Sequence, residues 1–317
     1  MSTSRPTPPP YDTELMAALE LTPLGPSRTL GMLDELREGL PVVEEVLPPS
    51  VSHRELEIPG YQGHRMLISV FAPEGVTAAS PGILYVHGGG MVSGNRLSGI
   101  DQLLTWIVRF GLVVVSVDYR FAPENPDPVP VEDCYAALVW TAENAEALGI
   151  DPDRLIVAGM SAGGGLAAGA ALLARDRRGP SLLGQLLMCP MLDDRNDSIS
   201  ARQFEGSGGW DRGSNDMGWT ALLGSRRGTD DVSIYAAPAR AADLSGLPPT
   251  FIDVGSAEVF RDEDVAWATG IWAAGGVAEL HVWPGGFHSF EIFAAHAAVS
   301  VDAMAARDRW VARLLGA

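Results

Sequence analysis

Short apolar segments alternate with longer segments of helical periodicity along most of the chain. Runs rich in β-branched and apolar residues, bounded by glycine or proline, predict strands at 65–71, 82–87, 112–118, 155–159, 183–189, 250–254 and 278–283. Apolar residues three and four positions apart predict helices at 14–21, 30–40, 131–148, 162–174, 265–274 and 299–315. Several strands are apolar on both faces, which is typical of a parallel sheet covered on both sides. The expected fold class is therefore α/β, with a mostly parallel central sheet and helices on both faces.

Two segments fall outside this alternation. Residues 1 to about 45 are rich in proline, and residues 191–244 contain a glycine-rich patch with Trp210 and Trp219. A structureless loop as long as the second segment is rare inside a compact domain, so we expect an insertion with helices of its own over the sheet's carboxyl edge. The predicted organisation is an N-terminal helical part of a cap at 1–45, an α/β domain at 46–190 and 245–317, and a cap insertion at 191–244.

Composition and charge narrow the class of protein. The 317 residues are 46% hydrophobic, without an apolar run long enough to predict a membrane span. The net charge of −18 argues against nucleic acid or an anionic membrane as a partner. Residues 1–10 lack the apolar stretch of a secretory signal, so a cytoplasmic location is expected. Two cysteines, Cys134 and Cys189, are too few for a disulfide framework and are expected to be small buried hydrophobic residues.

The strongest chemical signal is the sequence Gly159-Met160-Ser161-Ala162-Gly163, a G-x-S-x-G motif between a predicted strand and a predicted helix. This context is the one that a nucleophile elbow requires, because the tight turn leaves room only for small neighbours and exposes the serine hydroxyl. The following helix directs its positive end at a developing anion. Ser161 is therefore the candidate nucleophile. The alternative is a glycine-rich turn that carries a serine by chance.

A second motif, His87-Gly88-Gly89-Gly90, begins at the last residue of the predicted strand 82–87, directly after Ile83 to Val86. Consecutive glycines allow backbone N–H groups to approach a substrate oxygen closely. We expect Gly88 and Gly89 to form an oxyanion hole with the N–H of Ala162. A phosphate-binding loop would require G-K-[S/T], which does not follow here. His87 itself is expected to brace the loop.

A nucleophilic serine needs a base, and His288 is the candidate among six histidines. It follows the predicted strand 278–283 in a turn, which is where a parallel sheet presents catalytic groups. The remaining candidates are less well placed. His53 and His64 precede the first predicted strands, His87 is the last residue of one, His281 lies within one, and His296 lies in a helical stretch.

The supporting acid is expected between serine and histidine, in the loop after the strand 250–254. Glu258 lies in that loop, and Asp253 lies within the strand, where it should face the core or a neighbour. Three further acids, Asp262, Glu263 and Asp264, fall where the next helix begins, and negative charge is favourable there. Glu258 is therefore assigned the role of fixing the imidazole tautomer.

With these residues in place, the chain from about Gly82 to Phe290 resembles the hormone-sensitive-lipase-like α/β-hydrolases, the bacterial family IV esterases. The resemblance includes residues 118–124, Asp-Tyr-Arg-Phe-Ala-Pro-Glu, which are similar to the family's D-Y-R-L-A-P-E block and are expected to brace the oxyanion loop. It implies an α/β-hydrolase fold with a helical cap. It also implies Gly88 and Gly89 as oxyanion donors, Glu258 as the acid and His288 as the base. Four positions depart from the family pattern and affect the inferred substrate rather than the reaction: Met160, Glu258 in place of the more common Asp, Asp127 and Ser289.

The expected activity is hydrolysis of short- to medium-chain carboxylic esters through an acyl-enzyme, without a metal or an organic cofactor. Candidate substrate-binding residues, each of which could instead be ordinary packing, are Met91, Met160, Phe204 and Trp210. The resemblance further suggests a homodimer through the edge strand 278–283. Two alternatives stay open: an amidase or lactonase with the same triad, and a silent small-molecule-binding homologue. The plant gibberellin receptors resemble this family but lack the catalytic histidine, so His288 counts against the silent homologue.

Overall fold

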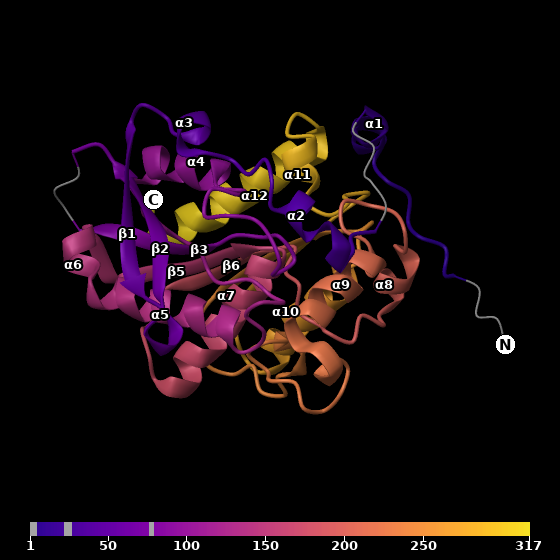
Figure 1. Cartoon of the computed structure of the whole chain (residues 1–317). Coiled ribbons are helices and arrows are strands. Elements are labelled where there is room, and N and C mark those ends of the chain that lie inside the picture. The colour runs from indigo at the N-terminus through magenta and orange to yellow at the C-terminus, as the bar shows by residue number, and fades with distance from the viewer. Residues whose placement is uncertain (1–4, 22–26, 76–78) are drawn as a thin grey trace.

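The structure is a computed structural model that describes residues 5–21, 27–75 and 79–317. Its centre is a sheet in the order β1-β2-β4-β3-β5-β6-β7-β8 (Figure 1). The pairs β1–β2 and β2–β4 are antiparallel, and every other neighbouring pair is parallel. The strands are β1 (Val51–Pro59), β2 (Arg65–Pro73), β3 (Ser80–Val86), β4 (Val113–Val117), β5 (Ile150–Met160), β6 (Gly184–Met188), β7 (Thr250–Gly255) and β8 (Ala278–Trp283).

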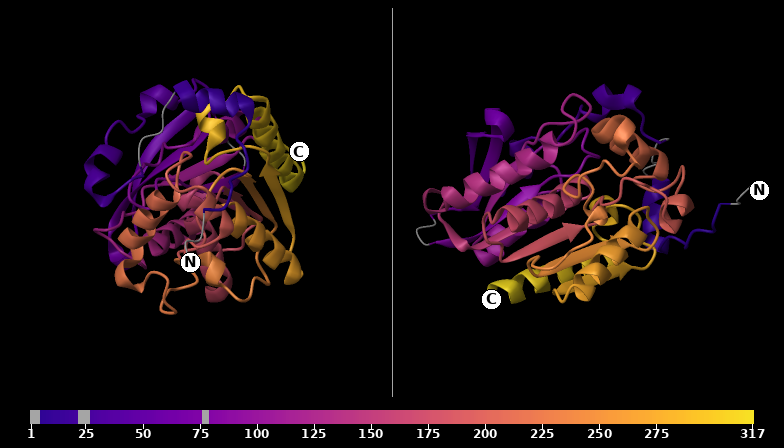
Figure 2. Two further views of the ribbon diagram at one scale, coloured as in Figure 1. Left: turned by 90° about the vertical axis from the view of Figure 1, so that its right-hand side faces the viewer. Right: turned by 90° about the horizontal axis from the view of Figure 1, so that it is seen from below.

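Helices cover both faces of this sheet. The described α-helices are α1 (Thr13–Leu21), α2 (Leu33–Leu36), α3 (Val43–Val46), α4 (Asp101–Phe110), α5 (Val129–Glu143), α6 (Ala145–Leu148), α7 (Ala162–Arg177), α8 (Ile199–Gln203), α9 (Arg212–Leu223), α10 (Arg261–Ala273), α11 (Phe290–Phe293) and α12 (Ala298–Leu315). Short 3₁₀ turns are η1 (Leu30–Met32), η2 (Tyr61–Gly63), η3 (Gly224–Arg226) and η4 (Pro238–Arg240). Helices α4 and α12 pack together on one face, and α5 and α7 pack together on the other (Figures 1 and 2). The mostly parallel α/β sheet predicted from the sequence is confirmed.

The pattern of burial explains why the central strands could be predicted. All residues of β3, β4, β6 and β7 are buried, because each strand lies between two layers of helices. The outer strand β8 is only partly buried. Strands β3, β5, β7 and β8 run in the same direction, so the chain segments that follow them emerge at one end of the sheet. Helices α1, α8 and α9 lie toward that end (Figure 1).

Several elements differ from the sequence prediction. Strand β1 was not predicted, because it is an edge strand with exposed charged residues and only Val51 and Ile58 buried. His53 therefore lies within the sheet rather than before it, with Nε2 2.9 Å from Ser69 Oγ. Helix α4 was also missed, although its buried Leu103, Leu104 and Ile107 have helical spacing.

Two of the predicted helices are divided or shortened in the structure. The stretch 131–148 is divided into α5 and α6, and 30–40 contains only η1 and α2. His296 lies in the turn between α11 and α12 rather than in a helix.

Among the described residues, no helix is both long and apolar enough to span a lipid bilayer.

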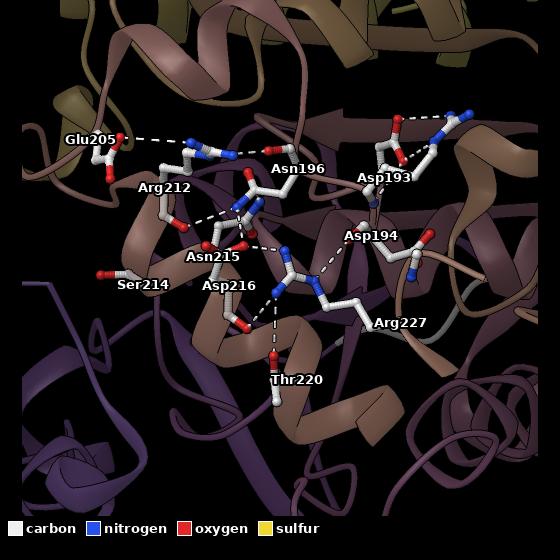
Figure 3. Close-up of polar contacts among 12 residues, drawn as sticks. Asp193, Asp194, Asn196, Glu205, Arg212, Ser214, Asn215, Asp216, Thr220 and Arg227 are labelled. Atoms are coloured by element: carbon white, nitrogen blue, oxygen red, sulfur yellow. Dashed lines mark hydrogen bonds and ion pairs between the residues drawn. The ribbon is translucent and has the colours of Figure 1, made fainter. Parts of the chain in front are cut away.

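The segment 191–244 contains α8, α9, η3 and η4, and a network of polar side chains ties it together (Figure 3). Asn196 Nδ2 donates to Asp216 Oδ1 at 2.7 Å, and Asn215 Nδ2 donates to Asn196 Oδ1 at 3.0 Å. Arg227 pairs with Asp216 and donates to the carbonyl oxygen of Asp194 at 3.1 Å. Because buried polar groups are costly unless they are hydrogen-bonded, this network specifies one conformation for a segment with little regular structure. That 191–244 acts as a cap remains a prediction.

The N-terminal segment reaches the same end of the molecule. Helix α1 packs Leu15 against Phe287 and Phe290, and Asp12 donates its N–H to the carbonyl oxygen of Gly285 at 3.1 Å. The N-terminal segment therefore contacts the loop that carries His288. Residues 1–4 and 22–26 of the predicted 1–45 unit lie outside the described residues.

Candidate active site

The candidate nucleophile lies at a sharp bend between β5 and α7. Ser161 has φ 57° and ψ −124°, a backbone conformation that residues with a side chain rarely adopt. Its N–H donates to the carbonyl oxygen of Met188 at 2.8 Å. A Cβ on Gly159 would lie 2.2 Å from the carbonyl oxygen of Gly163, and a Cβ on Gly163 would lie 2.1 Å from that of Val86. The bend therefore requires glycine at both positions, as the motif predicted.

The three residues proposed from the sequence as nucleophile, base and acid lie in contact. His288 Nε2 is 2.9 Å from Ser161 Oγ, and His288 Nδ1 is 2.6 Å from Glu258 Oε2. Since a carboxylate oxygen only accepts, Nδ1 carries the proton and donates it to Glu258. The lone pair on Nε2 is then free to accept the hydroxyl proton of Ser161. All three residues are nearly buried, with exposed fractions of 6% for Ser161, 6% for His288 and 1% for Glu258.

The surroundings of Glu258 and His288 hold the imidazole in this orientation. Burial raises the pKa of Glu258, while the charge of protonated His288 and its hydrogen bond oppose that rise. Phe260 packs edge-on against the imidazole, with ring centroids 5.1 Å apart. Because an imidazolium beside a carboxylate is stabilised by their opposite charges, the arrangement favours proton transfer from Ser161 to His288.

Backbone amides from two separate loops converge near Ser161. In the described part of the chain, the N–H groups of Gly88, Gly89 and Ala162 donate to no protein acceptor. Gly89 has φ 116°, and a Cβ there would lie 2.0 Å from the carbonyl oxygen of Ser93. Only glycine fits at that position. The bend that Gly89 allows leaves unpaired amides at the edge of the cavity, where they are able to bind an oxyanion.

Residues 118–124 brace this loop, as the sequence indicated. Tyr119 donates its hydroxyl to the carbonyl oxygen of His87 at 3.1 Å, and the two rings stack with centroids 4.5 Å apart. Burial lowers the pKa of His87 to about 4, so its ring is neutral at pH 7. His87 Nδ1 lies 2.7 Å from the carbonyl oxygen of Gly88 and donates to it. The N–H of Ala122 donates to the carbonyl oxygen of Met91 at 3.0 Å. This hydrogen bond holds the segment that follows the three glycines against residues 118–124.

A cavity of about 240 Å³ opens over Ser161 and His288. Its lining consists of Gly88, Gly89, Gly90, Ser98, Gly99, Met160, Ser161, Gly209, Trp210, His288, Ser289, Ile292 and Phe293. Among the described residues, that lining contains no aspartate, glutamate, lysine or arginine. A larger hollow of about 880 Å³ lies between β1, β2 and α6 and contains none of the predicted site residues. The smaller cavity therefore suits a small neutral ligand.

The prediction of cavity-lining residues was only partly successful. Met160 and Trp210 line the cavity, but Met91 and Phe204 do not. Both of the latter are buried in the hydrophobic core, with at most 1% of each residue exposed.

Lining residues that the sequence analysis missed include Ser98 and Gly99, which precede α4, and Ile292 and Phe293 on α11. Ile292 and Phe293 could have been recognised in the sequence, because they are an apolar pair close behind the candidate base. In the structure they are about half exposed (52% and 44%). An exposed apolar pair beside a candidate base marks the rim of a binding site.

The family model described as "alpha/beta hydrolase fold" matches residues 83–292. This chain belongs to that family. It is 37% identical over 238 residues to the carboxylesterase NlhH of Mycobacterium tuberculosis, covering 74% of each chain. It is 29% identical over 242 residues to the ethyl acetate hydrolase of Pseudomonas putida, again covering 74% of each.

A solved structure agrees with this assignment. The bacterial heroin esterase superposes with a TM-score of 0.89 at 38% identity, and 99% of each chain is covered. The resemblance to hormone-sensitive-lipase-like members that the sequence indicated is thus confirmed, as is the α/β-hydrolase fold.

A buried ionic cluster supports the strand and helix on either side of His288 in this α/β hydrolase. Asp253 on β7 accepts from Arg307 Nε at 2.8 Å and from Trp283 Nε1 at 3.1 Å. Arg307, on α12, also donates to Glu291 Oε1 at 2.6 Å. The prediction that Asp253 faces the interior is confirmed. Because a buried charge left without its partner is strongly destabilising, these contacts fix β7, β8 and α11 relative to one another.

The acids at the start of α10 behave differently from one another. Asp262 accepts from the N–H of Ser200 at 2.8 Å and from Arg261 Nε at 2.8 Å. Glu263 is buried and accepts from the N–H of Leu192 at 2.7 Å. Asp264 is fully buried, and neither carboxylate oxygen has a hydrogen-bond partner among the described residues. The expectation of simple helix-terminus charges therefore does not describe Glu263 and Asp264.

This burial predicts how stability depends on pH. Burial, with the neighbouring charge of Glu263, raises the pKa of Asp264 well above its ordinary value. Between the unfolded and folded pKa values the native state holds a proton that the unfolded state has lost. The stabilisation of the native state by protonated Asp264 is thus complete below about pH 4. It is lost as pH rises, by up to about 1.4 kcal/mol per pH unit. Asp264→Asn should remove this contribution.

Chemical denaturation of wild type and Asp264→Asn from pH 4 to pH 8 checks the prediction. We expect the variant's free energy of unfolding to rise relative to that of wild type as pH increases. Asp262→Asn is the matched control, since Asp262 is already paired. If the free energy of unfolding changed with pH in the same way for wild type and Asp264→Asn, Asp264 would have to be ionised in the native protein.

Proposed function

We propose that this protein is a serine carboxylesterase, with Ser161 as nucleophile, His288 as general base and Glu258 as supporting acid. The observation that carries the proposal is the chain of short contacts from Glu258 through His288 to Ser161. These contacts lie at a cavity whose lining, over residues 5–21, 27–75 and 79–317, includes no aspartate, glutamate, lysine or arginine. The relatives support the same reaction class, since they include a carboxylesterase and an ethyl acetate hydrolase.

In the proposed reaction His288 accepts the proton of Ser161 through Nε2 as Oγ attacks the ester carbonyl carbon. The resulting oxyanion accepts hydrogen bonds from the N–H groups of Gly88, Gly89 and Ala162. One such donor typically contributes about 3 kcal/mol of transition-state stabilisation. Collapse of the tetrahedral intermediate expels the alcohol, which takes the proton from His288. An acyl group then remains on Ser161.

The second half of the reaction repeats these steps with water. His288 removes a proton from a water molecule, which attacks the acyl carbon and forms a second oxyanion in the same position. Collapse of this second intermediate breaks the bond between the acyl carbon and Oγ, Oγ takes the proton back from His288, and the carboxylic acid leaves. Throughout, Glu258 stays ionised, keeps the Nδ1–H tautomer and stabilises the imidazolium that forms twice in each cycle.

The small cavity supports a preference for short acyl chains. Trp210 lies over Gly90, where a Cβ would be 2.4 Å from the indole ring, so the cavity is narrow on that side. A volume of about 240 Å³ is below the range of typical drug-sized ligand sites. We therefore expect the highest kcat/KM with acyl groups of about two to eight carbons, in line with the family resemblance.

Release of p-nitrophenol from esters between acetate and palmitate tests both the reaction and the chain length. Wild type should hydrolyse the acetate to octanoate esters fastest, and Ser161→Ala should be inactive with all of them. A maximum at palmitate would contradict the predicted chain length. Equal, slow release by wild type and variant would contradict the esterase itself. An amide and a lactone assayed beside the esters test the alternative substrates.

A further inference from the structure

The mechanism above does not use the thiol of Cys189, which lies in the active-site region. Cys189 directly follows β6, with 4% of the residue exposed. Its Sγ, a carboxylate oxygen of Glu258 and a ring nitrogen of His288 all lie within 4.8 Å of one another. Cys189 Sγ is also 3.9 Å from Ser289 Oγ, and Ser289 lines the cavity. The thiol is therefore one side chain away from the space that a ligand enters.

This group of side chains has spare coordinating capacity. Glu258 uses Oε2 to accept from His288, but Oε1 is buried without a hydrogen-bond partner among the described residues. Sulfur, imidazole nitrogen and carboxylate oxygen are the ligand types that Zn²⁺ prefers. Zn–S and Zn–N or Zn–O bonds of about 2.3 and 2.1 Å place tetrahedral ligand atoms between about 3 and 4 Å apart. Small side-chain movements would bring the three groups to that spacing.

We propose that Cys189, Glu258 and His288 form an inhibitory site for a thiophilic divalent cation, for which Zn²⁺ is the probe. The inference rests on the proposed function for its effect on activity, but binding itself depends only on these three side chains. The metal binds the thiolate of Cys189, a carboxylate oxygen of Glu258 and Nδ1 of His288. A fourth position remains for water, as in zinc sites with three protein ligands.

The proton balance explains why such binding stops catalysis. Before binding, the imidazole proton is on Nδ1 and the sulfur carries a second proton. When the metal takes Nδ1, the imidazole proton moves to Nε2 and the thiol proton is released to solvent. Nε2 then has no lone pair with which to accept the proton of Ser161. Glu258 also loses its hydrogen bond with His288. Ser161 is therefore left without a general base, and His288 without its supporting acid.

Cobalt binding tests the site without reference to activity. Co²⁺ added to the protein should produce a thiolate-to-cobalt charge-transfer absorption with one ion per chain. The band should persist in Ser161→Ala and disappear in Cys189→Ala and Cys189→Ser. Cys134→Ala is the matched control, because Cys134 is the other buried free thiol, lies on α5 and does not belong to the group that Cys189 forms with Glu258 and His288. A band that survives in both Cys189 variants would overturn the proposal, as would its absence from wild type.

Inhibition by Zn²⁺ tests the consequence. We expect Zn²⁺ to inhibit ester hydrolysis and the hard cation Mg²⁺ to have no effect at the same concentration. Cys189→Ala should retain its activity while its half-inhibitory Zn²⁺ concentration rises at least about tenfold, because one ligand is removed. Cys134→Ala should respond like wild type. Equal inhibition of wild type and Cys189→Ala contradicts the inference, whereas a cobalt band in a protein without esterase activity contradicts the proposed function alone.

Discussion

Ser161→Ala is expected to lower kcat for ester hydrolysis by about 10⁴- to 10⁶-fold. The variant keeps the cavity and the oxyanion donors but loses the oxygen that attacks the carbonyl. His288→Ala should cost a similar amount, because without Nε2 the hydroxyl of Ser161 stays protonated. The double variant should be no slower than either single variant, since the residues act as one unit.

Steady-state kinetics with p-nitrophenyl butyrate checks this prediction, and far-ultraviolet circular dichroism confirms that each variant is folded. His296→Ala is the matched control for His288→Ala, because His296 is exposed in the turn between α11 and α12. We expect that variant to retain wild-type activity. Losses that add in the double variant would mean that Ser161 and His288 contribute independently, which the 2.9 Å contact between Oγ and Nε2 argues against.

The second large effect concerns the acid. Glu258→Gln is expected to lower kcat by about 10³- to 10⁴-fold while leaving the fold intact. The amide is nearly the same size as the carboxylate, but its NH₂ group can donate to Nδ1 and so favours the tautomer with the proton on Nε2. It also removes the negative charge that stabilises the imidazolium.

Asp262→Asn is the control for this acid. Asp262 was the nearby alternative in the sequence, but in the structure it pairs with Arg261 and accepts from Ser200. We expect its kcat to stay within a few-fold of wild type. If Asp262→Asn lost more activity than Glu258→Gln, the acid would have to be reassigned.

The sequence predicted the local chemistry well because that chemistry constrains neighbouring residues. The bend at Ser161 forms only if positions 159 and 163 have no Cβ. A motif of five consecutive residues therefore shows this requirement in the sequence. The oxyanion loop is similar, since Gly89 has no room for a side chain. Buried parallel strands were also recognisable, because helices on both faces make every position of β4 apolar or small.

Features that depend on contacts between distant segments were not predictable in this way. Asp264 has the local sequence of an ordinary helix start, and only the packing around α10 reveals that its carboxylate is buried without a hydrogen-bond partner in the described part of the chain. Cys189 was recognised as a buried residue, but it precedes His288 by about a hundred positions, and no periodicity indicates that they meet. Phe204 was expected in the cavity and instead packs in the core, with its ring centroid 6.1 Å from that of Tyr11.

The most direct test of the mechanism is to label its nucleophile covalently. A fluorophosphonate probe reacts with an activated serine and is retained through digestion, so mass spectrometry of the peptides identifies the nucleophile. The proposed mechanism predicts one label per chain on the peptide that contains Ser161, with loss of activity in proportion to labelling. Labelling should be absent in Ser161→Ala and greatly slowed in His288→Ala. Inactivation that follows a label on any other residue, or full activity in protein labelled at Ser161, would contradict it.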